Sequence, residues 1–108
     1  EITPAGQRLQ HIAEMMNSHP ETDYSLDELA AMANLSPWYF LRQFRLRYGM
    51  PPHAWLIQAR LRKARQLLQN GGRPADVSLQ CGFTDQSHFT RHFKRAMGVS
   101  PGKFMQRR

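Results

Sequence analysis

The chain has 108 residues, 41% of them hydrophobic and 10% aromatic, which predicts one folded domain or two small lobes that share packing and excludes a disordered chain. Fifteen Lys and Arg against eight Asp and Glu give a net charge of +7, which favours a polyanionic partner, either nucleic acid or an acidic membrane surface. The alternative is that the positive charge has no binding partner and only keeps the chain in solution.

The number of cysteines and the hydropathy of the sequence indicate the cellular compartment. The single cysteine, Cys81, excludes an internal disulfide and fits a reducing compartment, for which we expect the cytoplasm and its nucleoid. No apolar run approaches the roughly 18 residues of a membrane span, and no secretory signal is visible. Because the first residue is Glu1 rather than Met, we expect part of a longer protein, with a stand-alone protein as the alternative.

Helix-start and helix-stop residues predict three helices in the first half. Thr3 precedes a proline as an N-cap, Ser25 and Glu28 have the spacing of a capping box, and Gly49 is a helix stop. The predicted helices cover residues 4–18, 26–33 and 37–48.

A longer helix is predicted from Pro52 to about Gln69. Its apolar stripe consists of Ile57, Leu61, Ala64 and Leu68. Its polar side carries Arg60, Arg62, Lys63 and Arg65, which either follow DNA phosphates or form a solubilising face. About 18 residues span about 27 Å as a helix, a suitable spacer because major grooves recur every ~34 Å on one face of B-DNA.

The second half predicts helices at 74–81, 86–97 and 101–106, with Asp85 as an N-cap and Gly98 as a stop. No segment alternates with period two, so we predict an all-α fold of seven helices. We divide it into a first lobe (1–50), a linker helix (51–70) and a second lobe (71–108).

The two halves repeat each other. Phe40, Arg42 and Phe44 return 49 residues later as Phe89, Arg91 and Phe93. Before each aromatic helix, a small residue lies four positions ahead of an Asn or Gly that precedes a large apolar residue. These residues are Ala30, Asn34 and Leu35 in one copy and Ser78, Gly82 and Phe83 in the other. A helix-turn-helix requires this pattern, because the helices cross closely and the turn needs φ > 0.

Burial of the repeated Phe residues leaves an outer face on each aromatic helix. Arg on such a face can donate two hydrogen bonds to guanine, Gln can pair with adenine, and Leu or the Thr methyl group can contact a thymine methyl. We predict DNA base contacts from Trp38, Leu41, Arg42, Gln86, Ser87, His88, Thr90 and Arg91. We predict phosphate contacts from Ser36, Arg45, Arg62, Lys63 and Lys94.

Several of these residues have a structural alternative. Trp38 can be partly buried against the preceding helix, and Leu41 can extend the core. Arg42 and Arg91 can be solvated or ion-paired. Ser36 is first an N-cap, although a cap leaves backbone N–H groups that can bind a phosphate.

Two motifs resemble the signature of the AraC/XylS family of bacterial transcription regulators. They are Gly82-Phe83-x-Asp85-x-Ser87-x-Phe89-x-Arg91-x-Phe93-Lys94-Arg95-x-x-Gly98-x-Ser100-Pro101-x-x-Phe104 and Arg60-Leu61-x-x-Ala64-x-x-Leu67-Leu68. The resemblance runs from about Ser25 to Phe104. It implies a DNA-binding domain of two helix-turn-helix subdomains joined by a long helix, with recognition helices (about 37–48 and 86–97) in two successive major grooves.

The resemblance also implies site residues and partners. Family members contact bases from positions that match Trp38, Leu41 and Arg42 in one lobe and Gln86, Ser87, Thr90 and Arg91 in the other. They mostly activate transcription, partly by touching RNA polymerase, and most carry an effector-sensing domain, which nothing in this chain resembles. Leu41 stands where relatives often have a polar residue, and Phe104 stands where tyrosine is common.

Other functions are less well supported. His88 and His92 are spaced to face one metal, but no third ligand has suitable spacing. We therefore predict no metal, no cofactor and no catalysis. Sequence-independent binding by a basic nucleic-acid module and a helical protein-interaction module remain the alternatives to sequence-specific DNA binding.

Overall fold

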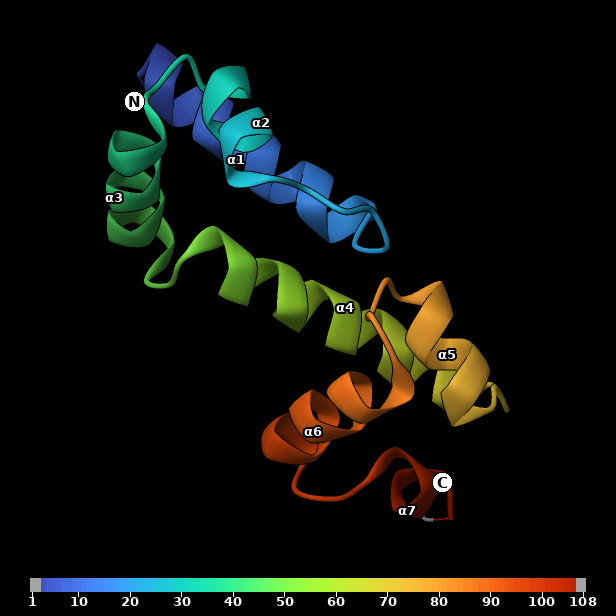
Figure 1. The fold of residues 1–108 in the computed structure, drawn as a ribbon. Coiled ribbons are helices and arrows are strands. Elements are labelled where there is room, and N and C mark those ends of the chain that lie inside the picture. The colour runs from blue at the N-terminus through green and yellow to red at the C-terminus, as the bar shows by residue number, and fades with distance from the viewer. Residues whose placement is uncertain (1–2, 107–108) are drawn as a thin grey trace. The chain divides into compact units, whose positions relative to one another are not determined.

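The computed structural model describes residues 3–106, which form seven α-helices and no strand (Figure 1). The helices are α1 (Pro4–Ser18), α2 (Leu26–Met32), α3 (Pro37–Tyr48), α4 (Pro52–Gln69), α5 (Pro74–Gln80), α6 (Gln86–Met97) and α7 (Pro101–Gln106). Each begins and ends within one residue of its predicted bounds, which confirms the all-α prediction. Among the described residues, no helix combines the length and the apolar character that crossing a membrane requires.

Side chains close the helix starts as predicted. The Thr3 hydroxyl accepts an N–H of the first turn of α1 at 3.0 Å. Ser25 and Glu28 exchange two hydrogen bonds of 3.1 Å. Hydrogen bonds from the Ser25 side chain and backbone to the Glu28 carboxylate lower its pKa. The Asp85 carboxylate accepts the backbone N–H of His88 at 2.7 Å. These caps satisfy backbone donors that a helix start otherwise leaves unpaired.

The turn between the first and second helix of each pair is left-handed, as the repeat predicts. Asn34 has φ of 58° between α2 and α3, and Gly82 has φ of 90° between α5 and α6. Asn and Gly are the residues that reach this backbone region at the lowest cost. The two helix pairs therefore have the local turn of a helix-turn-helix.

The chain forms two compact units that divide between Leu56 and Ile57. In the first unit, α1, α2 and α3 pack around the fully buried rings of Phe40 and Phe44. Trp55 packs against this core, because its indole N–H donates to the Ala13 carbonyl at 3.0 Å and its ring meets Phe44 edge-on at 6.0 Å. Leu9, Ile12, Ala13 and Met16 form the buried stripe of α1 in this core.

The second unit repeats this construction with α4, α5, α6 and α7. Phe89 and Phe93 are fully buried, and Phe104 of α7 meets Phe93 edge-on at 5.4 Å. Cys81 is a free cysteine that is fully buried in this core. The α4 side of this core is the predicted stripe of Ile57, Leu61, Ala64 and Leu68.

Residues 51–70 were predicted to form a linker, and the side chains of α4 belong to both cores. Leu56 is buried in the first core and Ile57 in the second. Arg60 corrects the prediction of a wholly basic polar side, since it is only 5% exposed and its guanidinium lies 6.0 Å from the Phe83 ring centroid. The reason is helical phase: Arg60 lies three residues after Ile57 and therefore on the buried face.

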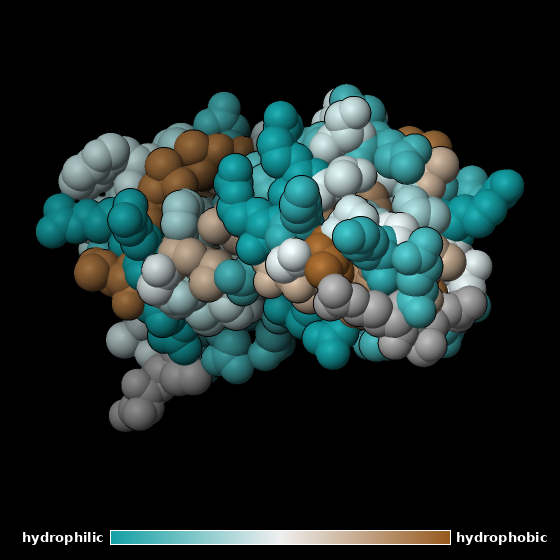
Figure 2. Space-filling view, turned by 90° about the horizontal axis from the view of Figure 1, so that it is seen from below, coloured by the Kyte–Doolittle hydropathy of each residue, from teal (hydrophilic) through white to brown (hydrophobic). Residues whose placement is uncertain are grey.

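Hydrophilic side chains dominate the molecular face in Figure 2, where hydrophobic side chains appear only in separate areas. Some large apolar residues lie on the surface: Leu46 is 71% exposed and Leu79 is 68% exposed. Single exposed apolar residues of this kind are ordinary on a folded domain.

Phe93→Ala tests the second core. Truncating a fully buried Phe typically costs ~3–5 kcal/mol, so we expect loss of the second unit in a chemical denaturation series followed by circular dichroism. Leu79→Ala is the matched control, since an exposed side chain should change stability by no more than about 0.5 kcal/mol. An unchanged denaturation midpoint for Phe93→Ala contradicts the burial of this ring.

Candidate nucleic-acid interface

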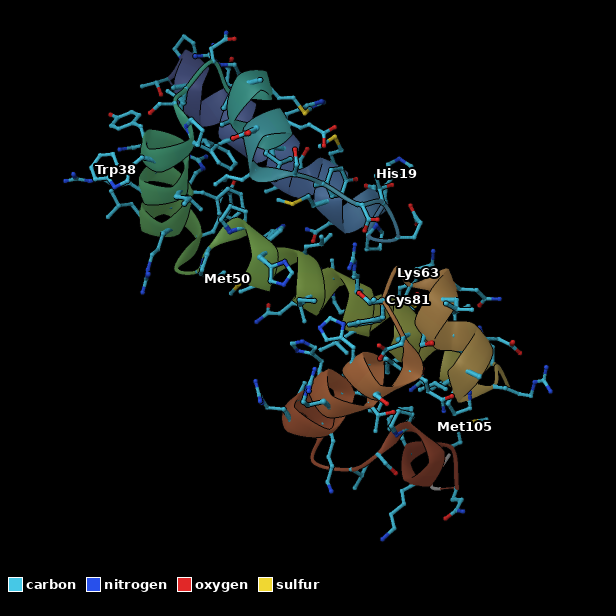
Figure 3. All side chains as sticks on the ribbon, viewed as in Figure 1. His19, Trp38, Met50, Lys63, Cys81 and Met105 are labelled. Atoms are coloured by element: carbon cyan, nitrogen blue, oxygen red, sulfur yellow. The ribbon has the colours of Figure 1, made fainter. Side chains whose placement is uncertain are left out.

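The outer face of α3 lies opposite the buried rings of the first unit. Trp38, 67% exposed, projects outward from the first turn (Figure 3), and Arg42 and Arg45 are exposed on the following turns. Residues 38, 42 and 45 share one side of a helix because the spacings of four and three residues approximate one turn. One side of α3 therefore presents one aromatic and two cationic side chains over its first three turns.

Trp38 and Arg42 contact each other. The Arg42 guanidinium carbon lies 5.6 Å from the Trp38 ring centroid, within the range of a cation–π interaction. A guanidinium held over a ring loses fewer conformations when it binds, while the N–H groups at its edge remain available. The predicted alternative was partial burial of Trp38 against α2, and the residue is 67% exposed, so most of it remains on the outer face.

Leu41 lies at the border between the outer face and the core. It is half-buried and lines an apolar pocket of the first unit together with Met16, Leu29 and Leu56. The expectation that Leu41 extends the core is therefore partly met. The exposed remainder lies beside Trp38 and Arg45 by helical phase.

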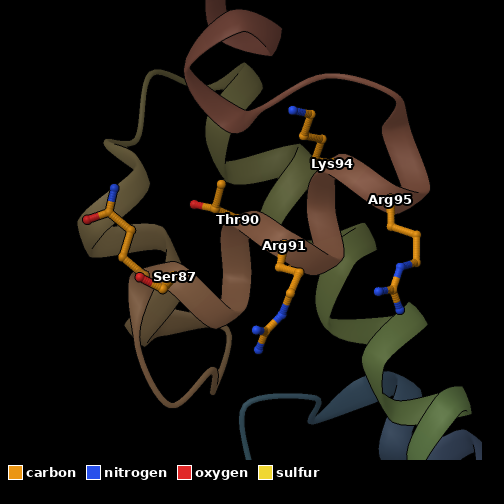
Figure 4. A pocket seen from close by; sticks show the side chains of 6 residues that line it. Ser87, Thr90, Arg91, Lys94 and Arg95 are labelled. Atoms are coloured by element: carbon orange, nitrogen blue, oxygen red, sulfur yellow. The ribbon is translucent and has the colours of Figure 1, made fainter.

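The outer face of α6 is more polar than that of α3, and its side chains line one continuous hollow. Five predicted residues, Gln86, Ser87, Thr90, Arg91 and Lys94, line one open hollow on the second unit (Figure 4). Arg95 completes the lining and was not predicted, although its position four residues after Arg91 is a signal for it. No acidic residue lines this hollow, so its charge favours an anion.

His88 does not lie on this face, which corrects its predicted place. Its ring packs 5.7 Å from the Phe83 ring and 4.6 Å from the His92 ring, measured between centroids. His88 is 100° around α6 from Ser87 and opposite Thr90, so it lies at the edge of this face, where its ring packs on Phe83 and His92.

The predicted phosphate contacts divide between exposed and structural groups. Arg45, Arg62 and Lys94 are exposed. The Ser36 hydroxyl accepts the Tyr39 N–H at 3.2 Å and so serves as the cap of α3. Lys63 is half-buried beside α5 (Figure 3), and its ammonium group donates to the Gln80 carbonyl at 3.3 Å.

The Lys63 contact has a physical cause. The carbonyls of the last turn of α5 lack partners within the helix, and a cation there also interacts favourably with the helix dipole. This gives Lys63 a structural role that its spacing on α4 did not indicate.

The family model described as a helix-turn-helix domain matches residues 29–107. The matched segment contains α3 to α7 and both left-handed turns. The chain belongs to the AraC/XylS family.

Curated relatives of this AraC-type domain are bacterial transcription regulators. The HTH-type transcriptional regulator MtrA of Neisseria gonorrhoeae is 34% identical over 91% of the chain and 33% of its own length. The transcriptional activator NphR of a Rhodococcus species is 41% identical over 90% of the chain and 28% of its own length. The chain spans about a third of the length of the curated relatives it matches.

Solved structures agree with this membership. The DNA-binding domain of AdpA, solved in complex with a target DNA, has a TM-score of 0.87 and 30% identity, and the match covers 93% of this chain and 91% of that one. An AraC-type transcriptional regulator from Chromobacterium violaceum has a TM-score of 0.83 at 25% identity, with 94% and 91% covered. The family consists of DNA-binding regulators, in agreement with the prediction that this AraC-type domain is not an enzyme.

A double-mutant cycle tests the contact between Trp38 and Arg42 in this AraC-type domain. We expect Trp38→Ala to weaken binding to a duplex selected from random sequences, and to cost about 0.5–1 kcal/mol less when Arg42 is already alanine, because the cation–π contact is then absent. Trp38→Phe should retain part of this coupling. Fully additive losses in a fluorescence titration contradict a positioning role for Trp38.

Proposed function

We propose that this AraC-type domain binds duplex DNA sequence-specifically and thereby regulates transcription. The observation that carries the proposal is the duplicated outer face: Arg42 and Arg91 hold the same helical position, each opposite a buried pair of Phe rings. The relatives named as transcription regulators and the AdpA domain solved with its target DNA support it. Non-specific binding needs positive charge but no such repeated position.

In this mechanism, α3 and α6 are the recognition helices, and each enters a major groove with its first turns facing the bases. Arg42 and Arg91 each donate two hydrogen bonds to the O6 and N7 atoms of a guanine. Gln86 pairs with adenine, and Thr90 and Ser87 donate or accept hydrogen bonds beside it. Trp38 and the exposed part of Leu41 supply apolar contacts such as those with a thymine methyl. His88 is not included, because it packs on Phe83 and His92.

We propose that the two recognition helices occupy successive major grooves, about 34 Å apart on one face of B-DNA. Phosphate contacts then come from Arg45, Arg62 and Lys94, and from backbone N–H groups at the start of α3, where Ser36 is the cap. Lys63 contributes mainly by holding the end of α5, since its ammonium group is bonded to Gln80.

The regulatory outcome is proposed from the relatives. Two of them are named activators, the transcriptional activators RhaS of Klebsiella pneumoniae and NphR of Rhodococcus. We infer that this regulator also activates transcription, partly by touching RNA polymerase. An effector ligand, if the regulator has one, then binds a part of the protein outside this chain. The site of action is the nucleoid.

Substitution of the two arginines tests sequence-specific recognition. Arg42→Ala and Arg91→Ala should each cost about 1–3 kcal/mol on the selected duplex and relax the preference at different base pairs. A binding-site selection from random duplexes, repeated with each variant, measures both effects. Arg47→Ala is the matched control, because it removes an equal charge from α3 on the side away from Trp38 and Arg42, where Arg47 contacts Tyr48.

Two results would overturn the proposal. If both arginine variants lose the same affinity on selected and on random duplexes, the chain is a sequence-independent basic module. If the unmodified chain binds no duplex even at low ionic strength, a protein-interaction module is the better account.

A salt series tests the phosphate contacts separately. Arg62→Ala should weaken binding to all sequences about equally and reduce the slope of log affinity against log salt concentration by about one, because one phosphate contact is removed. Lys63→Ala should lower the thermal stability of the second unit and change the slope less, since its ammonium group is bonded to the Gln80 carbonyl. A reduced salt slope for Lys63→Ala, together with reduced thermal stability for Arg62→Ala, would contradict the structure.

A further inference from the structure

One flank of α6, beside the predicted base contacts, carries a pair of histidines. His88 and His92 are one helical turn apart, and their Nε2 atoms are separated by 3.1 Å. The two rings stand nearly perpendicular, at 86°, with their centroids 4.6 Å apart. No other two of the five histidines are four residues apart in the sequence. The proposed DNA contacts use neither ring.

The distance between these nitrogen atoms is the one that a shared metal ion requires. A transition metal binds imidazole nitrogen at about 2.0–2.1 Å, and ligand angles between about 90° and 109° then place two nitrogens roughly 2.9–3.4 Å apart. The observed 3.1 Å lies within this range. The separation of the two nitrogens therefore suits one shared ion, which the spacing in the sequence alone did not establish.

The hydrogen bond between the two rings sets a cost for metal binding. Two neutral imidazoles in contact through Nε2 share one proton, since two N–H groups or two lone pairs in contact repel each other. The Nδ1 atom of His88 is buried and has no hydrogen-bond partner, so a proton there is unsatisfied and the tautomer with the proton on Nε2 is favoured. For a metal ion to accept both Nε2 lone pairs, the proton on Nε2 of His88 must move to its Nδ1, where it has no partner, and this move lowers the affinity.

We propose that His88 and His92 bind one divalent transition metal ion, of the Cu²⁺, Ni²⁺ and Zn²⁺ class, through their Nε2 atoms. Neutral imidazole suits these ions, whereas Mg²⁺ and Ca²⁺ prefer oxygen ligands. Affinity should follow the general order in which Cu²⁺ exceeds Ni²⁺ and Zn²⁺. This site is separate from the proposed DNA-binding face and does not depend on that function.

The remaining coordination positions belong to water or to an outside ligand. Among the described residues, no group of three or more His, Cys, Asp or Glu side chains is placed to hold an ion. A site with two protein ligands binds more weakly than a closed structural site and exchanges its ion readily. The Nδ1 atom of His88 has no hydrogen-bond partner, and this also weakens metal binding, because a partner at that atom normally orients a metal-binding ring.

Binding is expected to stabilise the second unit. The ion cross-links two successive turns of α6 and contributes only when the helix is folded, so it raises the stability by mass action. The base-facing residues lie on another side of α6 and stay accessible. The consequence is a metal-dependent change in the stability of the second recognition helix.

The experiment measures the thermal midpoint of the whole chain by circular dichroism with Cu²⁺, Ni²⁺, Zn²⁺ or Mg²⁺. We expect a rise on the order of 5 °C at about tenfold excess over the dissociation constant, with Cu²⁺ effective at the lowest concentration and Mg²⁺ without effect. His88→Gln and His92→Gln should each abolish the rise. His11→Gln is the matched control and should retain it, because His11 is an exposed histidine on α1.

Electron paramagnetic resonance of the Cu²⁺-loaded chain gives a readout that does not depend on stability. The intact chain should show two imidazole nitrogens bound to one ion, and each single variant should show fewer. No thermal shift with any of the three ions overturns the proposal, as does an equal loss of binding in His11→Gln. If a variant proves poorly folded without metal, the count of bound nitrogens in the intact chain still decides the question.

Discussion

The burial of two phenylalanine pairs controls how the recognition helices are oriented. Phe40 and Phe44 in α3, and Phe89 and Phe93 in α6, are fully buried. Each pair spans one turn, so together the rings fix the rotation of a helix about its own axis. Every other position follows from that rotation: residues about half a turn away face outward, and those to the sides pack on neighbouring helices. The site is therefore a consequence of core packing.

Much of the fold follows from local signals that agree with one another. Thr3, Ser25 and Asp85 act as caps, and Asn34 and Gly82 have the left-handed turns that the repeat requires. These are short-range effects between residues a few positions apart, so the sequence alone is sufficient to predict them. Because the aromatic spacing is also local, the same reasoning predicted the exposed face of α3 and five of the six residues that line the α6 hollow.

The predictions that needed revision concern contacts between distant segments. Lys63 was assigned to phosphates, yet it bonds to the carbonyl of Gln80 at the end of another helix. Arg60 appeared polar by type, but helical phase places it on the buried side, over Phe83. His88 was assigned by its nearness to the start of α6, and its angle around the helix turns it toward Phe83 and His92. The angle of a residue around its helix predicts the place of its side chain better than residue type or nearness along the chain does.

The two outer faces share one backbone pattern but differ in chemistry. On α3, Arg42 lies over the ring of Trp38, and the half-buried Leu41 adds apolar surface. On α6, the hollow is lined only by polar and cationic side chains, including Gln86 and Arg91. A duplicated reader with identical faces would prefer a repeated DNA sequence, whereas these faces prefer different base edges. On the proposed function, the DNA site is therefore asymmetric and is bound in one orientation. A regulator that must face one direction along a promoter can obtain that direction from a single copy of this chain.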